Sequence, residues 1–478
     1  MDLKFSFYFV LGILILIGLV FLNFAYFEQP NEIVECKDCN VILISIDALR
    51  ADHLGIYNYQ RNTSPNIDNF FSKGFVFKSA FSQAPNTLPS HMSMLTGLYS
   101  SRHKILPIYD NSSLLTNISL STKYKTIAEI LKIYDYKTQG FYAGSDHMDP
   151  RFGFGRGFDN YEPNDLFITK STEDLFNIKN ISNSTEVFDF LNDSKNKKFF
   201  LFLHTQGAHD PYLTDPPYDT MFDSGYNGKI IGNKDEFDSL LVKNNISWVS
   251  DPFTKIRLLF WGRVNKSDPD DMKHLIALYD NTIRRSDSFF GNFLQHLNSL
   301  GLLDHTIIIV TADHGEEFYE HGGIVHEKLY DETIHVPLLI YVPNSKPRII
   351  SNQVGLVDIT PTVLSILGLP EPQYIDGRSL KFLMENPNSS DPNQLLYSEF
   401  LTQRTVRTPE WKLIKTVNQS TSYEFFDLKN DPGEKINLDG KGNPKENELK
   451  EILENWEFTM NSTYADVRFL NSTFIGYP

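Results

Sequence analysis

The chain has 478 residues, of which 41% are hydrophobic, an ordinary proportion for a globular protein with a large buried core. It is long for one domain, so we expect one large domain with a small appendage. The formal net charge of −16 argues against a nucleic-acid partner, because the chain has no basic surplus with which to neutralise phosphates.

The N-terminal region contains an uncharged apolar segment, Phe5–Phe27. A helix of this length crosses the hydrocarbon core of a bilayer. No small-x-small cleavage pattern follows it, so the sequence favours an uncleaved anchor over a removed signal peptide. We therefore expect residues 1–27 to form a transmembrane anchor and residues 28–40 a polar tether, with the rest of the protein membrane-anchored and extracytoplasmic.

Two further features concern the compartment. Cys36 and Cys39, which lie in the tether, could form a small disulfide loop or remain two idle thiols, and a zinc site would need further ligands nearby. Asn-x-Ser/Thr sequons are spread along the chain after the tether, which predicts an exported glycoprotein. They begin at Asn62, Asn111, Asn117, Asn180, Asn183, Asn192, Asn245, Asn265, Asn388, Asn418, Asn461 and Asn471.

The central part of the chain alternates apolar strands with helices. The predicted helices are Thr122–Tyr134 and the long amphipathic Met272–Leu300. Continuous apolar runs, typical of strands buried on both faces, occur at Val41–Ile46, Phe199–Leu203, Thr306–Val310 and Val336–Val342. This alternation predicts an α/β domain over residues 41–390, with a mixed or parallel sheet and helices on both faces.

Two kinds of segment fall outside this pattern. Tyr161–Asn196 and Tyr212–Asp268 are polar and are expected to be insertions over one face. After the joint Ser389–Asn393, we expect a small α+β subdomain over residues 391–478. Its predicted elements are the strands Leu395–Phe400, Trp411–Val417 and Tyr423–Leu428 and the helix Glu446–Trp456.

Several residues suited to chemistry follow the strands. Asp47, His209 and Asp313 come just after apolar runs, and functional residues of such sheets gather at the carboxyl ends of strands. Thr87, two residues before a proline, marks a helix start and by itself is most often only an N-cap. A helix start also attracts anions, and a hydroxyl there could attack a bound ester if a cation lowered its pKa. Asp47 and the pair Asp313-His314 could hold that cation.

Ordered motifs from about Asn40 to Glu457 resemble the sulfatase family of the alkaline phosphatase superfamily. They are Ser45–Gly55, Thr87–Gly97 with Ser101–His103, Phe202–Tyr212, Thr311–Gly315 with His326, Asp358–Thr362 and Glu424–Glu434. The resemblance implies an alkaline-phosphatase-like fold and a metal site at Asp47, Thr87, Asp313 and His314, with Thr87 as the nucleophile. It further implies that His209 and His326 bind the transferred oxyanion or protonate the leaving group, although His326 could also be a surface histidine. We expect His204, Glu316, His321 and Arg102 to pack or cap.

Three departures from the family pattern indicate its threonine-nucleophile branch. Thr87 stands where sulfatases have Cys or Ser, and its oxidation would give a ketone rather than the aldehyde whose hydrate they use. The pairs Asp47-Ala48 and Asp313-His314 replace paired aspartates and Asp-Asn, which favours zinc or manganese over calcium. His91 replaces an arginine and so removes a charge beside the nucleophile.

We therefore predict a metal-dependent hydrolase or transferase of phosphoric or sulfuric esters, with a lipid or glycan substrate possible. The alternatives are a sulfuric ester hydrolase resembling arylsulfatases and a non-catalytic surface binding protein. In the resemblance, the two-metal phosphodiesterase branch carries an Asp-x-x-x-His pair at this strand, but here Thr205 precedes His209 by four residues. We thus expect one tightly held divalent ion, with any second site weak.

Overall fold

The computed structural model describes residues 33–107, 118–143, 146–163, 185–244, 252–386, 389 and 394–462. Within these ranges, no helix is long and apolar enough to cross a membrane. The predicted anchor Phe5–Phe27, the first part of the tether and most of the joint at Ser389–Asn393 lie outside the described residues. So do the sequons at Asn111, Asn117, Asn180, Asn183, Asn245, Asn388 and Asn471.

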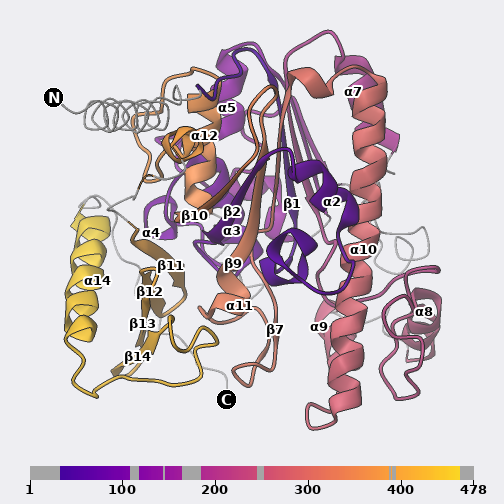
Figure 1. Ribbon diagram of the computed structural model, residues 1–478, viewed down its shortest axis with the longest axis vertical. Coiled ribbons are helices and arrows are strands. Elements are labelled where there is room, and N and C mark those ends of the chain that lie inside the picture. Colours follow the sequence, from indigo (N-terminus) through magenta and orange to yellow (C-terminus); the bar gives the residue numbers. More distant parts are fainter. Residues whose placement is uncertain are drawn as a thin grey trace, which may run out of the picture.

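An eight-stranded sheet forms the centre of the molecule, in the order β10-β2-β9-β6-β1-β5-β3-β4 (Figure 1). Its strands are β1 (Asn40–Ile46), β2 (Phe75–Phe81), β3 (Lys137–Tyr142), β4 (Asn160–Pro163), β5 (Phe199–Thr205), β6 (Thr306–Thr311), β9 (His335–Tyr341) and β10 (Arg348–Gly355). β9 runs antiparallel to β2 and β6, whereas the other neighbours are parallel. The predicted mixed sheet is confirmed.

The central strands β1, β5 and β6 are buried along their whole length, as their continuous apolar runs predict. Their register brings the carboxyl ends together: Ile46 pairs with Thr205, and Ser45 pairs with Thr311. The segments that follow these strands therefore meet at one edge of the sheet.

Helices cover both faces of the sheet (Figure 1). On one side lie α2 (Pro65–Phe71), α7 (Thr185–Ser194) and α10 (Pro269–Ser299), and on the other lie α3 (Thr87–Thr96), α5 (Ile127–Ile133) and α12 (Ile359–Ile366). The predicted helix at Thr122–Tyr134 is shorter than expected, because Thr126 and Glu129 form a capping box at its start. The shorter elements are α4 (Ser100–His103), α8 (Lys234–Lys243), α9 (Pro252–Trp261), β7 (Glu317–Phe318), β8 (Ile324–Val325), α11 (Asp331–Ile334) and α13 (Lys381–Glu385).

The segments predicted as polar insertions contribute in part to the body. α7, at the end of the first one, packs against β3 and α10 and buries Val187, Phe190 and Leu191. α8 and α9 lie in the second one, and α9 buries Phe260 and Trp261. The apolar residues of these helices are spaced for one face only, so the average composition of the segments concealed them.

A second sheet forms the predicted small α+β unit. It is an antiparallel meander of β11 (Leu396–Phe400), β12 (Gln403–Arg407), β13 (Trp411–Val417) and β14 (Thr421–Asp427), covered by α14 (Pro444–Ser462). A buried ion network joins it to the main body: Lys412 lies 2.7 Å from Glu434 and 2.8 Å from Asp331 of α11. The predicted domain boundary at residue 390 stays a prediction.

Near the start of the described chain, Cys36 and Cys39 form a disulfide, which is the first of the two alternatives left open by the sequence. The N–H of Cys36 donates to the carbonyl oxygen of Ile366 at 2.9 Å, so this loop is fixed to the end of α12.

Candidate active site

Two buried carboxylates lie at the carboxyl edge of the sheet. Asp47 directly follows β1, and Asp313 follows β6 after one residue. Oδ1 of Asp313 accepts the N–H of Ala48 at 3.3 Å and that of His314 at 3.0 Å. These bonds tie the turn after β6 to the turn after β1 and hold the two carboxylates beside each other.

Thr87 is the first residue of α3, whose start lies against this edge. The side chain of Asn86 caps the helix by accepting the N–H of Leu88 at 3.3 Å. The hydroxyl of Ser90 donates to the carbonyl oxygen of Asp313 at 2.6 Å, which holds the first turn against the end of β6. The hydroxyl of Thr87 and the positive end of the helix dipole therefore meet the two carboxylates.

His314 is the residue at which these groups converge. Its Nδ1–H donates to the carbonyl oxygen of Gly315 at 2.9 Å, so Nε2 carries the lone pair. That nitrogen lies 3.4 Å from Oδ1 of Asp47, 3.4 Å from Oδ2 of Asp313 and 3.3 Å from Oγ1 of Thr87.

This set of donor atoms fits a divalent cation. Ligands at about 2.1 Å from a tetrahedral ion are about 3.4 Å from one another, which is the spacing found around Nε2 of His314. Oδ1 of Asp47 and Oδ2 of Asp313 are buried and accept no hydrogen bond from the residues that the structure describes. Buried acceptors of this kind are costly unless a cation satisfies them. Asp47, Asp313, His314 and Thr87 would hold that ion.

The electrostatics of the pair agree with a cation site. Burial alone would raise the pKa of Asp47, but the rings of His209, His204 and His314 hold it well below its ordinary value. Burial and the charge of Asp47 raise the pKa of Asp313 above its ordinary value. The two carboxylates thus oppose each other's ionisation, and a bound dication would remove that repulsion.

His209 and His326, the remaining predicted residues, lie beside His314. The ring of His326 stacks on that of His314 at 4.0 Å between centroids and meets the ring of His209 edge-on at 5.3 Å. His209 donates from Nδ1 to the carbonyl oxygen of Asp210 at 2.7 Å. Burial and the neighbouring rings hold the pKa of His326 well below its ordinary value. The structure therefore brings all the predicted residues together: Asp47, Thr87, His209, Asp313, His314 and His326.

Comparison with known proteins identifies the family. The profile described as Sulfatase matches residues 39–369, and that of the N-sulphoglucosamine sulphohydrolase C-terminal region matches residues 319–459. The chain belongs to the sulfatase family. This match confirms the predicted family and the prediction of an enzyme that hydrolyses esters, and it sets aside the alternative of a non-catalytic binding protein. Proteins of the sulfatase family bind a divalent metal, in agreement with the cluster at Asp47, Asp313 and His314.

Several sulfatases are similar over most of their length. The N-acetylglucosamine-6-O-sulfatase of Bacteroides thetaiotaomicron is 24% identical, covering 92% of this chain and 90% of that protein. Human arylsulfatase K is 26% identical, covering 84% of this chain and 79% of that protein.

Solved structures share the fold. A protein solved with its substrate D-glucosamine-2-N,6-O-disulfate has a TM-score of 0.69 and 20% identity, covering 90% of this chain and 99% of that one. The phosphonate monoester hydrolase of Agrobacterium radiobacter has a TM-score of 0.68 and 18% identity, covering 89% of this chain and 96% of that one.

His91, which replaces an arginine of the sulfatase pattern, lies in α3 beside the backbone of Thr87. Its Nδ1–H donates to the carbonyl oxygen of Thr87 at 2.8 Å, and its Nε2 accepts the hydroxyl of Ser45 at 2.9 Å. Burial and the nearby His204 hold the pKa of His91 well below its ordinary value, so the ring is neutral. Both nitrogens are engaged, so His91 supports the backbone of Thr87 rather than binding a second ion with His204 and Asp313, although the donor atoms of this trio also lie within 4.8 Å of one another.

Two residues expected to pack or cap belong to the site. His204 is buried, and its Nε2 lies 3.3 Å from Oδ2 of Asp47, where it orients that carboxylate. Glu316 is buried near His326, with 3.6 Å between Oε1 and Nδ1. Sequence alone could not place them, because single residues near motifs have no spacing signal of their own.

The sequence analysis missed the support of His209. The carboxylate of the next residue, Asp210, accepts Nε and Nη2 of Arg257 at 3.0 and 2.9 Å and Nε1 of Trp261 at 2.9 Å. Arg257 and Trp261 belong to α9, within the segment predicted as a polar insertion. The apolar run around Arg257, Ile-Arg-Leu-Leu-Phe-Trp, is the signal that could have found this helix.

A cavity of about 330 Å³ lies at the hairpin of β7 and β8. It is lined by Arg257, Glu317, Gly323, Ile324, Val325, Glu327 and Lys328, so it combines charges of both signs with a small apolar surface. Val325 and Glu327 are the chain neighbours of His326, but none of the predicted site residues lines this cavity.

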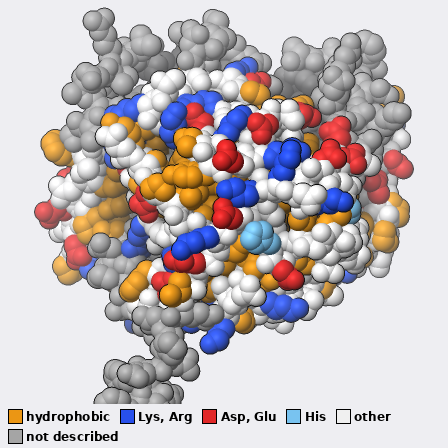
Figure 2. All heavy atoms as spheres, turned by 90° about the horizontal axis from the view of Figure 1, so that it is seen from above, with side chains coloured by type: hydrophobic (Ala, Val, Ile, Leu, Met, Phe, Trp, Pro, Cys, Tyr) orange, Lys and Arg blue, Asp and Glu red, His pale blue; other side chains and the backbone are white. Residues whose placement is uncertain are grey.

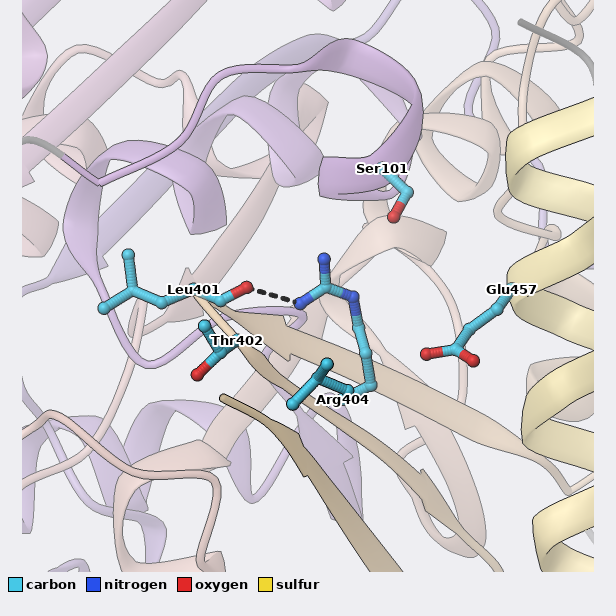
Figure 3. A pocket seen from close by; sticks show the side chains of 6 residues that line it. Ser101, Leu401, Thr402, Arg404 and Glu457 are labelled. Carbon is cyan, nitrogen blue, oxygen red and sulfur yellow. Dashed lines mark hydrogen bonds between the residues drawn. The ribbon is translucent and has the colours of Figure 1, made fainter. Parts of the chain in front are cut away.

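A second hollow, of about 240 Å³, lies between α4, the C-terminal sheet and α14 (Figure 3). Arg404 points into it and donates from Nη1 to the carbonyl oxygen of Leu401 at 2.8 Å, while its Nε lies 3.0 Å from Glu399. Its lining residues include none of the predicted site residues, and its cation is already paired, so this hollow is not the active site.

Proposed function

We propose that this sulfatase-family enzyme cleaves phosphoric esters with Thr87 as the nucleophile. The observation that carries the proposal is the convergence at Nε2 of His314, with Oγ1 of Thr87 at 3.3 Å and the carboxylates of Asp47 and Asp313 at 3.4 Å. A hydroxyl on a helix start, beside a cation-shaped cluster, is suited to attack a bound oxyanion.

A divalent ion held by Asp47, Thr87, Asp313 and His314 would lower the pKa of the threonine hydroxyl and neutralise charge on the transferred group. In the first half-reaction, Oγ1 of Thr87 forms a bond to phosphorus and the bond from phosphorus to the leaving oxygen breaks. His326, or His209, takes up the hydroxyl proton that Thr87 loses and gives a proton to that oxygen, and the leaving alcohol departs.

In the second half-reaction, the oxygen of water or of an acceptor alcohol bonds to phosphorus and the bond to Oγ1 of Thr87 breaks. The same histidine takes a proton from the incoming oxygen and returns a proton to Oγ1 of Thr87. With water the enzyme is a hydrolase, and with an alcohol of a lipid or glycan it is a transferase.

Threonine favours phosphorus over sulfur. A sulfatase that uses an aldehyde hydrate releases sulfate by collapse of that hydrate, a route closed to the ketone that Thr87 would give. The ester on Thr87 must instead be broken by attack on the transferred atom, which phosphorus permits more readily. The second candidate function is a sulfuric ester hydrolase using unmodified Thr87, and the similarity to an N-acetylglucosamine-6-O-sulfatase and to arylsulfatase K favours it.

The imidazole of His314 in the cluster supports zinc or manganese rather than calcium. We propose one tightly held ion. A second site on His209 and His326 would be weak, because Thr205 stands four residues before His209, where the two-metal phosphodiesterase branch carries an aspartate.

The decisive experiment compares aryl phosphate diesters, phosphate monoesters and sulfates, with zinc or manganese added to purified protein. We expect the diesters to turn over fastest, Thr87→Ala to lose at least about a thousandfold in kcat, and Thr421→Ala, at an exposed threonine, to match the parent. Mass spectrometry of quenched protein should find a phosphoryl group on Thr87. Faster turnover of sulfates than of every phosphate would favour the second candidate.

We further propose that the enzyme is anchored by residues 1–27 and faces the outside of the cell. The Cys36–Cys39 disulfide and the exposed sequons Asn62, Asn192, Asn265 and Asn418 support an exported body. Ile33, the first described residue, is 71% exposed, and the neighbouring α13 exposes Phe382.

These residues lie at the amino end of the strands, the end opposite the site. Figure 2 looks onto that end and shows hydrophobic, basic and acidic side chains interspersed on it. An anchor at the N-terminus would thus leave the active site turned away from the bilayer. Protease treatment of intact cells should release active protein, and complete protection would contradict this orientation.

A further inference from the structure

The turn that follows β1 carries Asp47 and has an unusual backbone. Ala48 has φ of +60°, in the left-handed region that residues with a Cβ atom rarely occupy. Both polar backbone groups of Ala48 have partners outside the turn. Its N–H donates to Oδ1 of Asp313 at 3.3 Å, and its carbonyl oxygen accepts the hydroxyl of Tyr279 at 2.7 Å. Two side chains that are distant along the sequence therefore hold the turn in a strained conformation.

Tyr279 lies in α10, the long helix on one face of the sheet, and binds this turn at two points (Figure 1). Its hydroxyl donates to the carbonyl oxygen of Ala48 and also accepts the N–H of Arg50 at 2.8 Å. The side chain of Tyr279 is fully buried. Its ring packs, at centroid distances between 4.9 and 5.5 Å, against the rings of His53, Tyr212 and Phe318. This packing fixes the position of the hydroxyl.

The conformation of Ala48 links the two carboxylates of the candidate metal site. Before the turn, the N–H of Asp47 donates to the carbonyl oxygen of Thr205 at 2.8 Å, which fixes the chain at the end of β1. A change of φ at Ala48 would rotate the peptide plane that bears its N–H relative to its carbonyl group. The N–H could then not meet Asp313 while the carbonyl oxygen meets Tyr279. The hydroxyl of Tyr279 therefore acts on the carboxylates of both aspartates.

We propose that Tyr279 is a positioning residue for the metal site: its hydroxyl holds Ala48 in the left-handed conformation in which Asp47 and Asp313 converge on one ion. This inference rests on the proposed function and adds to it a residue that is not itself a ligand. Tyr279 stabilises, before any ion binds, the arrangement that the ion requires. Such pre-organisation raises affinity, because the ion then need not reorder the turn.

The substitution Tyr279→Phe removes the hydroxyl and keeps the aromatic ring, so the packing of α10 remains. If only about a tenth of the metal-free variant has the competent turn, its apparent Kd for the ion rises about tenfold. We expect the Kd for zinc to rise about tenfold or more. Competition with a chromogenic chelator, on protein freed of metal by dialysis, measures this Kd without any reaction taking place.

The matched control is Tyr57→Phe, because the hydroxyl of Tyr57 makes the same pair of bonds elsewhere. It donates to the carbonyl oxygen of Phe77 in β2 at 2.9 Å and accepts the N–H of Leu338 in β9 at 3.0 Å. Neither strand carries a proposed metal ligand. Both variants should lower the Tm by about 1–4 °C, but Tyr57→Phe should keep the Kd for zinc within about twofold of the parent's. A comparable rise of Kd in both variants would reflect a general loss of stability and would overturn the proposal.

Glycine at position 48 tests whether the hydroxyl acts through the backbone of this turn. Glycine adopts a positive φ without steric cost, so it needs no hydroxyl to hold it there. Adding Ala48→Gly to Tyr279→Phe should therefore lower the raised Kd for zinc by about threefold or more. If the double variant bound zinc no more tightly than Tyr279→Phe, Tyr279 would not act through Ala48, and the proposal would fail.

The variant His314→Ala separates this inference from the proposed function, because it removes a proposed ligand. A parent that bound no zinc, or a His314→Ala variant that bound zinc as tightly as the parent, would overturn the metal site of the proposed function and this inference with it. An unchanged Kd in Tyr279→Phe, together with weakened binding in His314→Ala, would overturn this inference alone.

Discussion

The charge repulsion between the buried carboxylates of Asp47 and Asp313 should lower the stability of the protein when no metal ion is bound. Burial and the charge of Asp47 raise the pKa of Asp313, so its ionised form weakens the metal-free fold at neutral pH. In Asp313→Asn, the amide oxygen can keep the bonds from Ala48 and His314, and the amide N–H₂ replaces an oxygen that accepts nothing from the described residues. The metal-free variant should therefore be more stable than the metal-free parent.

The size of the effect follows from the distance. The ligand atoms of Asp47, Asp313 and His314 lie within 4.8 Å of one another. Two unit charges at that separation repel by about 3.5 kcal/mol at an effective dielectric constant of about 20, an upper limit that the nearby histidines reduce. We expect Asp313→Asn to raise the free energy of unfolding by about 1–3 kcal/mol, and the Tm by about 1–4 °C for a protein of this size.

Thermal unfolding without zinc measures the stability difference between parent and variant, and thermal unfolding with zinc measures how far the ion stabilises each. Ion at a hundredfold excess over Kd should stabilise the parent by about 2.7 kcal/mol and leave Asp313→Asn unchanged. Because the pKa of Asp313 is raised, ionised Asp313 destabilises the metal-free parent increasingly as the pH rises above 3.8, and it does not do so in acid. The difference in stability between the variant and the parent should therefore shrink at acidic pH. Asp304→Asn, at an exposed aspartate, is the control. A variant that is less stable without metal and still responds fully to zinc would refute the reasoning.

Three further outcomes follow from buried polar groups. His91→Ala should cost about 2–4 kcal/mol in chemical denaturation and lower kcat more than it changes KM, because it removes the support of the Thr87 backbone. Arg257→Ala should lower the free energy of unfolding by about 3–5 kcal/mol, because the buried carboxylate of Asp210 loses its paired cation. An unchanged Tm would contradict this. Burial raises the pKa of Glu434 to about 7 from 4.5, so stability present below pH 4.5 is lost as pH rises to about 7. Urea unfolding at pH 5 and pH 7.5 should show a fall of up to about 3 kcal/mol in the parent and a smaller one in Glu434→Gln.

The elements that sequence could predict are those whose burial is uniform. β1, β5 and β6 are apolar throughout because helices cover both of their faces, and the runs at Val41–Ile46 and Thr306–Val310 reported this directly. β2 and β10 lie at one end of the sheet and were not predicted, because polar residues such as Lys78 and Gln353 interrupt their apolar residues. β12 was missed for the same reason, since Arg404 and Arg407 alternate with buried residues.

The site was predictable where ordered motifs placed residues on strand ends, as for Asp47 and Asp313. It was not predictable where the partner comes from a distant helix, as when Arg257 of α9 supports Asp210 beside His209. Nor could sequence distinguish Glu316 from Glu317, adjacent residues of the same type whose hydrogen bonding differs completely. Such differences arise from the direction of each side chain in the packed structure, which spacing along the chain does not encode.

The charge of the site limits the charge of its substrate. Asp47 and Asp313 bring two carboxylates, and one dication would balance their charge, whereas His91 is neutral in place of the family's arginine. The nearby cation of Arg257 is already paired with Asp210. No net positive charge from these groups remains to hold a doubly charged phosphate monoester, but a singly charged ester requires none beyond the ion and the start of α3. Phosphate diesters, phosphonate monoesters and sulfate esters are all singly charged, so a site of this charge suits esters of sulfur and of phosphorus alike. Under the proposed function, the choice between the two elements falls to Thr87.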